Sequence, residues 1–251
     1  MQISDGFALS IDDHVATLRI DRQEKRNAMS AGMWRALPGI LAPLAQDPAV
    51  RVLVLAGAGG TFCAGADISE IAGLAENGDG TGATVTAERA LTEFPKPVIA
   101  MIEGFCVGGG CQLALACDLR IAAQDARFAI TPAKLGIVYP LSSTRRLVEH
   151  VGPSAAKLLL YSADQIDAGH ALRIGLVDEV LPPEALAERV YGLARTMASR
   201  SQLTLAASKE VVDGRADEAR FREWQKESAT ELAEGVAAFL ERRPPHFRWT
   251  R

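Results

Sequence analysis

Three consecutive glycines form the stretch of this sequence that is best suited to chemistry. Gly108, Gly109 and Gly110 open a run of small and apolar residues that ends at Asp118. The first backbone N–H groups of a helix have no partner inside the helix, and its dipole places partial positive charge there. Glycine also lets another molecule approach this backbone closely. The stretch is therefore either an oxyanion hole, which stabilises a negative oxygen, or only a tight strand-to-helix connection.

Apolar segments on both sides of the glycines are typical of buried strands. Residues 97–102 precede the glycine run, residues 119–123 follow it, and residues 50–56 form a similar run earlier in the chain. The glycine pattern is neither the Gly-x-Gly-x-x-Gly nucleotide fingerprint nor a phosphate loop followed by Lys-Ser/Thr. We therefore expect strand–helix units without a nucleotide-binding loop of either kind.

The N-terminal part of the chain predicts a hairpin followed by a helix. Alternating apolar residues place paired strands at 7–11 and 15–20. Helical apolar spacing covers residues 30–46, but Pro38 and Pro43 lie inside it and should kink or divide the helix. Small residues at 61–68 come just beyond the buried strand at 50–56, at the edge where α/β folds tend to bind ligands.

The C-terminal part of the chain changes character near residue 182. Glycine, threonine and acidic residues at 73–84 predict a mobile surface loop, and prolines make 128–140 an irregular connection. A short strand is expected at 176–180, and helices over about 87–93, 142–150, 154–162, 167–174, 183–200, 202–213 and 217–239. These elements predict an α/β core at 1–182 and a helical C-terminal region at 183–251.

Composition restricts the class of protein. With 251 residues, 27 basic against 31 acidic side chains and a net charge of −4, the chain argues against a nucleic-acid surface. No apolar run approaches the roughly 18–20 residues that a membrane span needs. The four cysteines show no paired Cys-x-x-Cys spacing, so we expect reduced thiols and a cytoplasmic protein. The four histidines are scattered, and no metal site is predicted.

An ordered set of short segments gives the chain its resemblance to a known family. It resembles the crotonase superfamily, also called the enoyl-CoA hydratase/isomerase family. The matching pieces follow one another along nearly the whole length: Asn27-Ala28, residues 62–68, Lys96 to Ala100, the Gly108–Cys111 helix start with Cys117-Asp118, and residues 128–136, 168–175 and 239–243.

The resemblance implies a crotonase-like spiral of ββα units with a helical trimerisation region. It implies an acyl-CoA thioester as ligand, with coenzyme A as part of the substrate and no permanently bound cofactor. Homotrimers or dimers of trimers are expected. The family holds the thioester oxygen with two backbone N–H groups, which we place here at Ala64 and Gly109. Such donors stabilise the charge of an enolate next to the thioester.

The same resemblance implies where coenzyme A binds. The adenine is expected against the backbone of Ala66, Asp67 and Ile68, with Ala28 nearby. The phosphates are expected near Lys25 and Arg26 and near basic residues of the C-terminal tail. Because the adenine is held by backbone groups, Asp67 has an alternative interpretation as a turn or capping residue only.

Two substitutions separate this chain from the family's hydratases. Those enzymes use two glutamates, and the matching positions are Gln112 and Pro132. Water addition requires one group that takes a proton from water and another that protonates carbon. Neither glutamine nor proline titrates, so we expect ordinary hydration to be weak or absent. Isomerisation is also disfavoured, because the family's isomerases generally keep a carboxylate at the second position.

Tyr139 suggests a different reaction. A tyrosine at this offset after the Thr131-Pro132 pair resembles the family's acyl-CoA decarboxylases, in which it faces the substrate carboxylate. Loss of CO₂ from a malonyl-type thioester itself generates the enolate, so this reaction needs less acid–base apparatus. Gln112 weakens this interpretation, because that branch usually keeps the first glutamate. The alternatives are a malonyl-type decarboxylase, a catalytically silent acyl-CoA-binding protein and, for Tyr139 alone, a core phenol.

Overall fold

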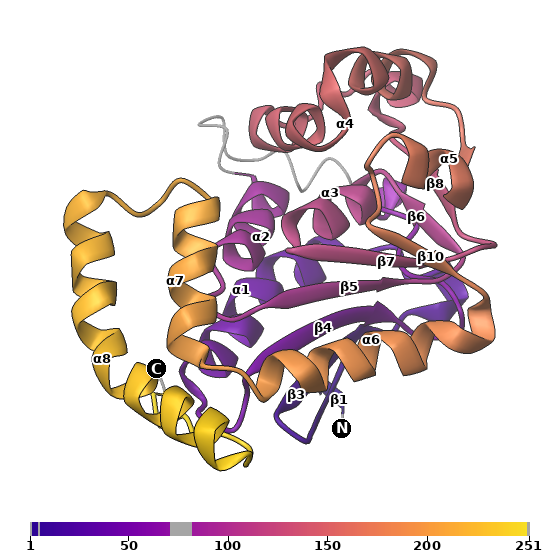
Figure 1. Ribbon diagram of the computed structural model, residues 1–251. Coiled ribbons are helices and arrows are strands. Elements are labelled where there is room, and N and C mark those ends of the chain that lie inside the picture. The colour runs from indigo at the N-terminus through magenta and orange to yellow at the C-terminus, as the bar shows by residue number, and fades with distance from the viewer. Residues whose placement is uncertain (1, 5, 71–81, 250–251) are drawn as a thin grey trace.

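A seven-stranded sheet forms the centre of the computed structural model, which describes residues 2–4, 6–70 and 82–249 (Figure 1). In spatial order its strands are β1 (Gln2–Ser4), β2 (Phe7–Asp12), β3 (Val15–Ile20), β4 (Val52–Gly57), β5 (Val98–Ile102), β7 (Leu119–Ala123) and β10 (Glu179–Leu181). Strands β1 to β3 pair antiparallel, and β3 to β10 pair in parallel. The predicted hairpin is confirmed, and Asp13 and His14 adopt positive φ at its turn.

A smaller sheet carries the glycine run. It consists of β6 (Phe105–Val107), β8 (Arg127–Ala129) and β9 (Ile166–Asp167), with β6 parallel to β8 and β9 antiparallel to β8. Strand β6 leads directly into α3 (Gly109–Ala116), so this sheet sets the position of the helix start. The sequence did not predict β6 or β8, because three residues are too few for an alternating pattern to be recognised.

Helices cover both faces of the large sheet, which explains why its strands are almost continuously apolar. Helices α1 (Ala31–Gln46), α2 (Ala83–Thr92) and α3 pack on one face, where Leu53 and Leu55 are fully buried. Helix α6 (Pro183–Ala198) covers the other face and packs Leu186 and Val190 against Val52. Burying one such leucine contributes roughly 2 kcal/mol of hydrophobic free energy.

Helix α1 runs uninterrupted through both prolines, so of the two expected effects, a kink or a division, the division is wrong. Its N-cap is Ser30, whose hydroxyl accepts a hydrogen bond from the Met33 N–H at 3.1 Å. Each internal proline removes one helical hydrogen bond. The buried face of the helix extends on both sides of the prolines, from Trp34 to Leu44. Packing of this face stabilises the helix on both sides of the prolines.

The remaining helices form two further groups (Figure 1). Helix α4 (Leu141–Ser162) breaks at Gly152, which divides it into the two predicted helices, and a short turn (η3, Pro132–Leu135) precedes it. Helix α5 (Ala168–Arg173) follows. Helices α7 (Gln202–Val212) and α8 (Glu218–Glu241) pack on each other in a lobe of their own.

The predicted C-terminal region is not separate from the sheet along its whole length. Helix α6 begins the predicted C-terminal region but lies on the sheet, whereas α7 and α8 lie beside it. The division at residue 182 and the assembly role of 183–251 stay predictions.

The mobile loop predicted at 73–84 falls mostly outside the described residues, and its last two positions, Ala83 and Thr84, begin α2.

Candidate active site

A cavity of about 740 Å³ lies around the start of α3. One wall is the segment after β4, including Ala64 and Ala66, and the second is the glycine turn with Gln112. The connection from Thr131 to Ser142 supplies a largely apolar third wall, and Trp34 of α1 closes the side next to Gly109. The volume is that of a site for a small-molecule ligand.

Glycine is required at the start of α3 for two different reasons. Gly108 has a φ of 54° and a ψ of −111°, a backbone conformation that residues with a side chain avoid. Gly109 is needed for space, because a Cβ atom there would lie 2.8 Å from the Trp34 ring and 3.3 Å from the Ala66 nitrogen. The backbones of Gly109 and Ala66 therefore lie next to each other at the cavity wall.

The hydrogen bonds of the structure argue against Ala64 as one of the two predicted oxyanion donors. The Ala64 N–H donates to the Arg26 carbonyl at 3.0 Å, so its single proton is already used, although Ala64 lines the cavity. Neither the Ala66 N–H nor the Gly109 N–H donates to any group in the part of the chain that the structure describes. Ala66 and Gly109, rather than Ala64 and Gly109, are the residues whose N–H groups a ligand oxygen can use. The sequence could not show this, because Arg26 comes from a distant loop.

The residues predicted to bind coenzyme A divide into two groups. Ala66 and Ile68 line the cavity, and Ile68 is largely exposed. Lys25, Arg26 and Ala28 are not among the lining residues. Lys25 and Arg26 are exposed on the loop around the short helix η1 (Gln23–Lys25), with the Arg26 guanidinium 5.2 Å from the centre of the Phe105 ring. The contact of Lys25 and Arg26 with the phosphates of coenzyme A stays a prediction.

Asp67 makes the contacts of a loop-stabilising residue. Its carboxylate accepts hydrogen bonds from the Ser69 N–H at 3.1 Å and the Ser69 hydroxyl at 2.6 Å. It also pairs with Arg22 at 2.8 Å. The Ser69 hydroxyl and Arg22 lower the pKa of Asp67 from 3.8 to about 2. These contacts favour its interpretation as a turn residue that shapes the backbone of 66–68.

Gln112 contacts a buried carboxylate that the sequence analysis missed. Its Nε2 donates to Glu88 of α2 at 2.9 Å and to the Thr84 carbonyl at 3.3 Å. Glu88 is 1% exposed and also accepts from Ser143 at 2.6 Å and pairs with Arg146 at 3.3 Å. The available signal was a single acidic residue in the apolar stripe of α2, between the buried Ala87 and Leu91.

Tyr139 and Pro132 both lie at the cavity. The Tyr139 hydroxyl donates to the Gly108 carbonyl at 3.4 Å, and burial raises the pKa of this phenol well above its usual range. Pro132 begins η3 and offers no titratable group. Among the described lining residues there is no Asp, Glu, Lys, Arg or His. General acid–base chemistry by these residues would therefore depend on Tyr139.

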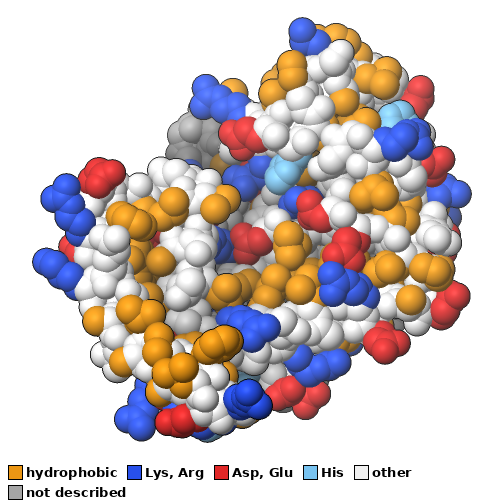
Figure 2. All heavy atoms as spheres, in the orientation of Figure 1, with side chains coloured by type: hydrophobic (Ala, Val, Ile, Leu, Met, Phe, Trp, Pro, Cys, Tyr) orange, Lys and Arg blue, Asp and Glu red, His pale blue; other side chains and the backbone are white. Residues whose placement is uncertain are grey.

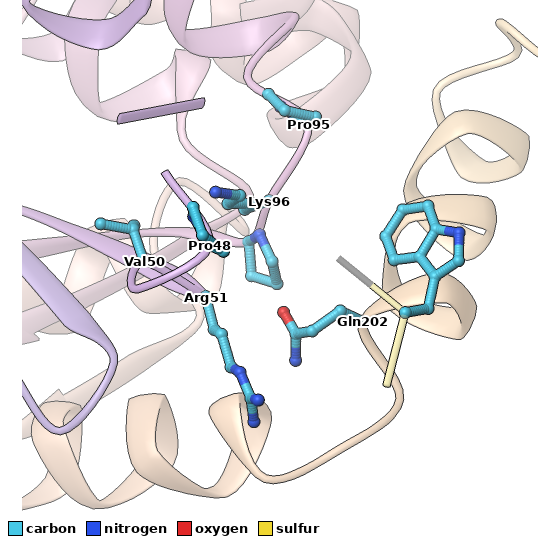
Figure 3. A pocket seen from close by; sticks show the side chains of 8 residues that line it. Pro48, Val50, Arg51, Pro95, Lys96 and Gln202 are labelled. Carbon is cyan, nitrogen blue, oxygen red and sulfur yellow. The ribbon is translucent and has the colours of Figure 1, made fainter. Parts of the chain in front are cut away.

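A second, separate pocket is too small for a comparable ligand. It lies between Pro48, Pro95 and Gln202 and holds about 20 Å³, room for little more than one water (Figure 3). Lys96 at this pocket donates to the Leu44 and Asp47 carbonyls at 3.0 and 2.7 Å, which satisfies the end of α1. Its contribution is structural.

Comparison with known proteins identifies the family of this chain. The family model described as Enoyl-CoA hydratase/isomerase matches residues 10–250. The chain is 36% identical to a crotonyl-CoA hydratase of Syntrophomonas wolfei, covering 97% of this chain and 98% of that protein. It is 34% identical to a 2,3-dehydroadipyl-CoA hydratase of Escherichia coli, covering 96% and 97% respectively.

Comparison with solved structures indicates the same family. An enoyl-CoA hydratase of Bacillus anthracis superposes with a TM-score of 0.86 at 32% identity, over 96% of this chain and 98% of that one. No described helix is long and apolar enough to cross a membrane. The crotonase-like fold is thus confirmed, and the chain belongs to the enoyl-CoA hydratase/isomerase (crotonase) family.

Proposed function

We propose that this chain is an enzyme that acts on acyl-CoA thioesters by stabilising an enolate oxygen with the N–H groups of Ala66 and Gly109. The observation that carries the proposal is that these adjacent donors are unpaired within the described chain and lie at the wall of a ligand-sized cavity. Preset donors of this kind need no reorganisation during the reaction. Loss of one typically costs about 10²–10³ in rate, roughly 3–4 kcal/mol.

The proposed reaction is not hydration by a pair of glutamates. The relatives are named hydratases, and their names alone would suggest water addition. The two glutamate positions inferred from the resemblance hold Gln112 and Pro132, and the described lining carries no carboxylate. Without a base for water and an acid for carbon, hydration should be slow.

Coenzyme A is proposed to bind as part of the substrate. Its adenine would contact the backbone of 66–68, whose shape Asp67 holds, and its phosphates would meet Lys25 and Arg26. The protein is proposed to work as a homotrimer or a dimer of trimers. Exposed apolar side chains on α8 support assembly through this lobe (Figure 2): Leu232, Val236, Phe239 and Leu240.

A second candidate reaction is decarboxylation of a malonyl-type thioester, and the position of Tyr139 favours it. The C–C bond to the carboxylate breaks, CO₂ leaves, and the electron pair stays on the substrate as the enolate. The enolate carbon then takes up one proton. A phenol whose pKa burial raises stays protonated at neutral pH, and a substrate carboxylate would have to take the Tyr139 proton from the Gly108 carbonyl, which accepts it here at 3.4 Å.

A panel assay tests these proposals. Purified protein is mixed with crotonyl-CoA and, separately, with malonyl-, methylmalonyl- and ethylmalonyl-CoA, and products are followed by mass. We expect little hydration of crotonyl-CoA. Rapid hydration would contradict the argument from Gln112 and Pro132, whereas decarboxylation alone would support the second candidate. Binding without turnover across the panel would indicate a silent acyl-CoA-binding protein.

A further inference from the structure

The two proposed N–H donors lie on different segments of the chain, so their separation depends on tertiary contacts. Ala66 follows β4, and Gly109 begins α3 after β6. The two segments pair at Cys63, whose carbonyl accepts a hydrogen bond from the Val107 N–H at 3.0 Å. From this pair to the donors, no backbone hydrogen bond joins the two segments within the described chain. Another contact must therefore hold the donors at a fixed distance.

The start of α1 is tied to the segment that carries Ala66. The Met29 N–H donates to the Gly65 carbonyl at 2.8 Å, and the Met29 carbonyl accepts from the Asp67 N–H at 2.9 Å. These two hydrogen bonds form a parallel bridge between Met29 and Ala66. Ser30, the next residue, caps the helix. The first turn of α1 therefore has a fixed place relative to the Ala66 N–H.

Trp34 extends from this first turn to the other donor. Its side chain is fully buried, and the far edge of its ring lies beside Gly109. A Cβ atom on Gly109 would lie 2.8 Å from Cζ2 and 3.2 Å from Cη2 of the ring. The buried indole N–H donates to no group within the described chain. The ring therefore acts here through its size and shape rather than through a hydrogen bond.

We infer that Trp34 is a positioning residue that sets the separation between the Ala66 and Gly109 N–H groups. This inference rests on the proposed enolate-stabilising function and deepens it. The ring fills the space between α1, which is bonded to the Ala66 segment, and the backbone of Gly109. Because protein interiors are close-packed, a smaller ring would let the start of α3 move toward α1. The two N–H groups would then no longer point at the same oxygen.

Acetoacetyl-CoA is a probe that reports this geometry without turnover. It is a thioester that loses the proton between its two carbonyls to solvent and becomes an enolate, which is followed by its near-ultraviolet absorbance. Two donors at the thioester oxygen favour the enolate, so the bound probe should be a stronger acid than the free probe. Trp34→Phe removes the far edge of the ring and breaks no hydrogen bond within the described chain. We expect it to lower the acid dissociation constant of the bound probe about tenfold.

Leu41→Ala is the matched control for Trp34→Phe. Leu41 is buried on the same helix but does not line the cavity, and both substitutions remove the same number of side-chain atoms. Both variants should lower the urea midpoint, because both leave unfilled space in the core. Only Trp34→Phe should change the acid dissociation constant of the bound probe. A merely structural role for Trp34 would leave this constant at its wild-type value, or change it alike in both variants, and would overturn the inference.

Gly109→Ala supplies a second measurement. Its added Cβ meets the ring in the wild type but finds space in Trp34→Phe, so its effect on the constant should be clearly smaller in that background. Equal effects in the two backgrounds would also overturn the inference. Trp34→Leu replaces Trp34→Phe in both comparisons if the latter does not fold. A wild type that does not bind the probe, or binds it without favouring the enolate, would contradict the proposed function and with it this inference.

Discussion

At the scale of single residues, the proposed chemistry depends on backbone groups and neutral side chains. Ala66 and Gly109 contribute N–H groups, so their side chains need only be small enough to leave room for a ligand. The acidic side chains nearby, Asp67 and Glu88, act on the shape of the site rather than at the cavity surface. The described lining is therefore neutral apart from helix and peptide dipoles.

Gly109→Ala tests the oxyanion hole. The added Cβ would lie 2.8 Å from the Trp34 ring and 3.3 Å from the Ala66 nitrogen, so it would displace one donor or the other. We expect turnover of whichever thioester the panel identifies to fall by about 10²-fold. Gly192→Ala is the control, because a Cβ there meets nothing within 4 Å. Full activity of Gly109→Ala, with the control also active, would remove the argument for this hole.

His150 predicts a pH dependence of stability. Burial, and then the nearby Arg120, lower its pKa from 6.5 to about 4. Arg146 acts in the same direction, and Asp178 opposes both. The unfolded chain takes up this proton at a higher pH than the folded one, so stability is lost as pH falls from about 6.5 to about 4. Urea unfolding of wild type and His150→Gln across this range should show a shallower decline in the variant. Parallel curves would refute the assignment.

At the scale of elements, packing rather than local preference decides two features of the site. The three residues of β6 are paired by β8 and deliver the chain to α3. Helix α1 places Trp34 beside Gly109 and stays continuous although two prolines oppose it. In both cases contacts with distant segments compensate for a weak or unfavourable local signal.

Pro43→Ala should therefore stabilise the protein. Pro43 is exposed within α1, and replacing it restores a helical N–H donor. The gain should be about 1–2 kcal/mol, less than the full helix penalty because alanine also frees the unfolded chain. Pro183→Ala is the control: Pro183 is the first residue of α6, where proline is favoured, so no gain is expected. Urea midpoints at constant m-value measure both changes, and equal shifts would contradict the argument.

At the scale of the whole molecule, α7 and α8 form a lobe that is tied to the core by a few polar contacts. Lys209 of α7 binds Asp118 at 2.9 Å and the Lys96 carbonyl at 3.1 Å. Hydrophobic side chains gather on this lobe (Figure 2), where Phe239 is 83% and Leu240 is 74% exposed. Such a surface is expected to meet another chain.

Leu240→Glu tests the proposed assembly. We expect the wild type to sediment as a trimer or hexamer and the variant to shift toward the monomer, because a charge would be buried at the interface. Leu172→Glu is the control, since Leu172 is also exposed but lies on α5, away from α8 (Figure 1). A wild-type monomer, or a variant that assembles like the wild type, would contradict the trimer proposal.

Local sequence patterns were enough to predict several elements of the fold and the family. The hairpin, the buried strands and the glycine run at the start of α3 were all predicted, because each depends on neighbouring residues. The ordered motifs also identified the family. The replacement of both hydratase glutamates stays a prediction, since it depends on matching Gln112 and Pro132 to the family pattern.

Only the tertiary structure decided which polar groups at the cavity already have a partner within the chain. The Ala64 N–H is used by Arg26, which leaves Ala66 as the available donor. Gln112 is oriented by Glu88 of another helix. A backbone N–H has one proton to donate. Which acceptor takes it depends on which segments, far apart in the chain, lie next to it in the fold. The sequence alone could therefore predict the type of site but not its final set of donors and acceptors.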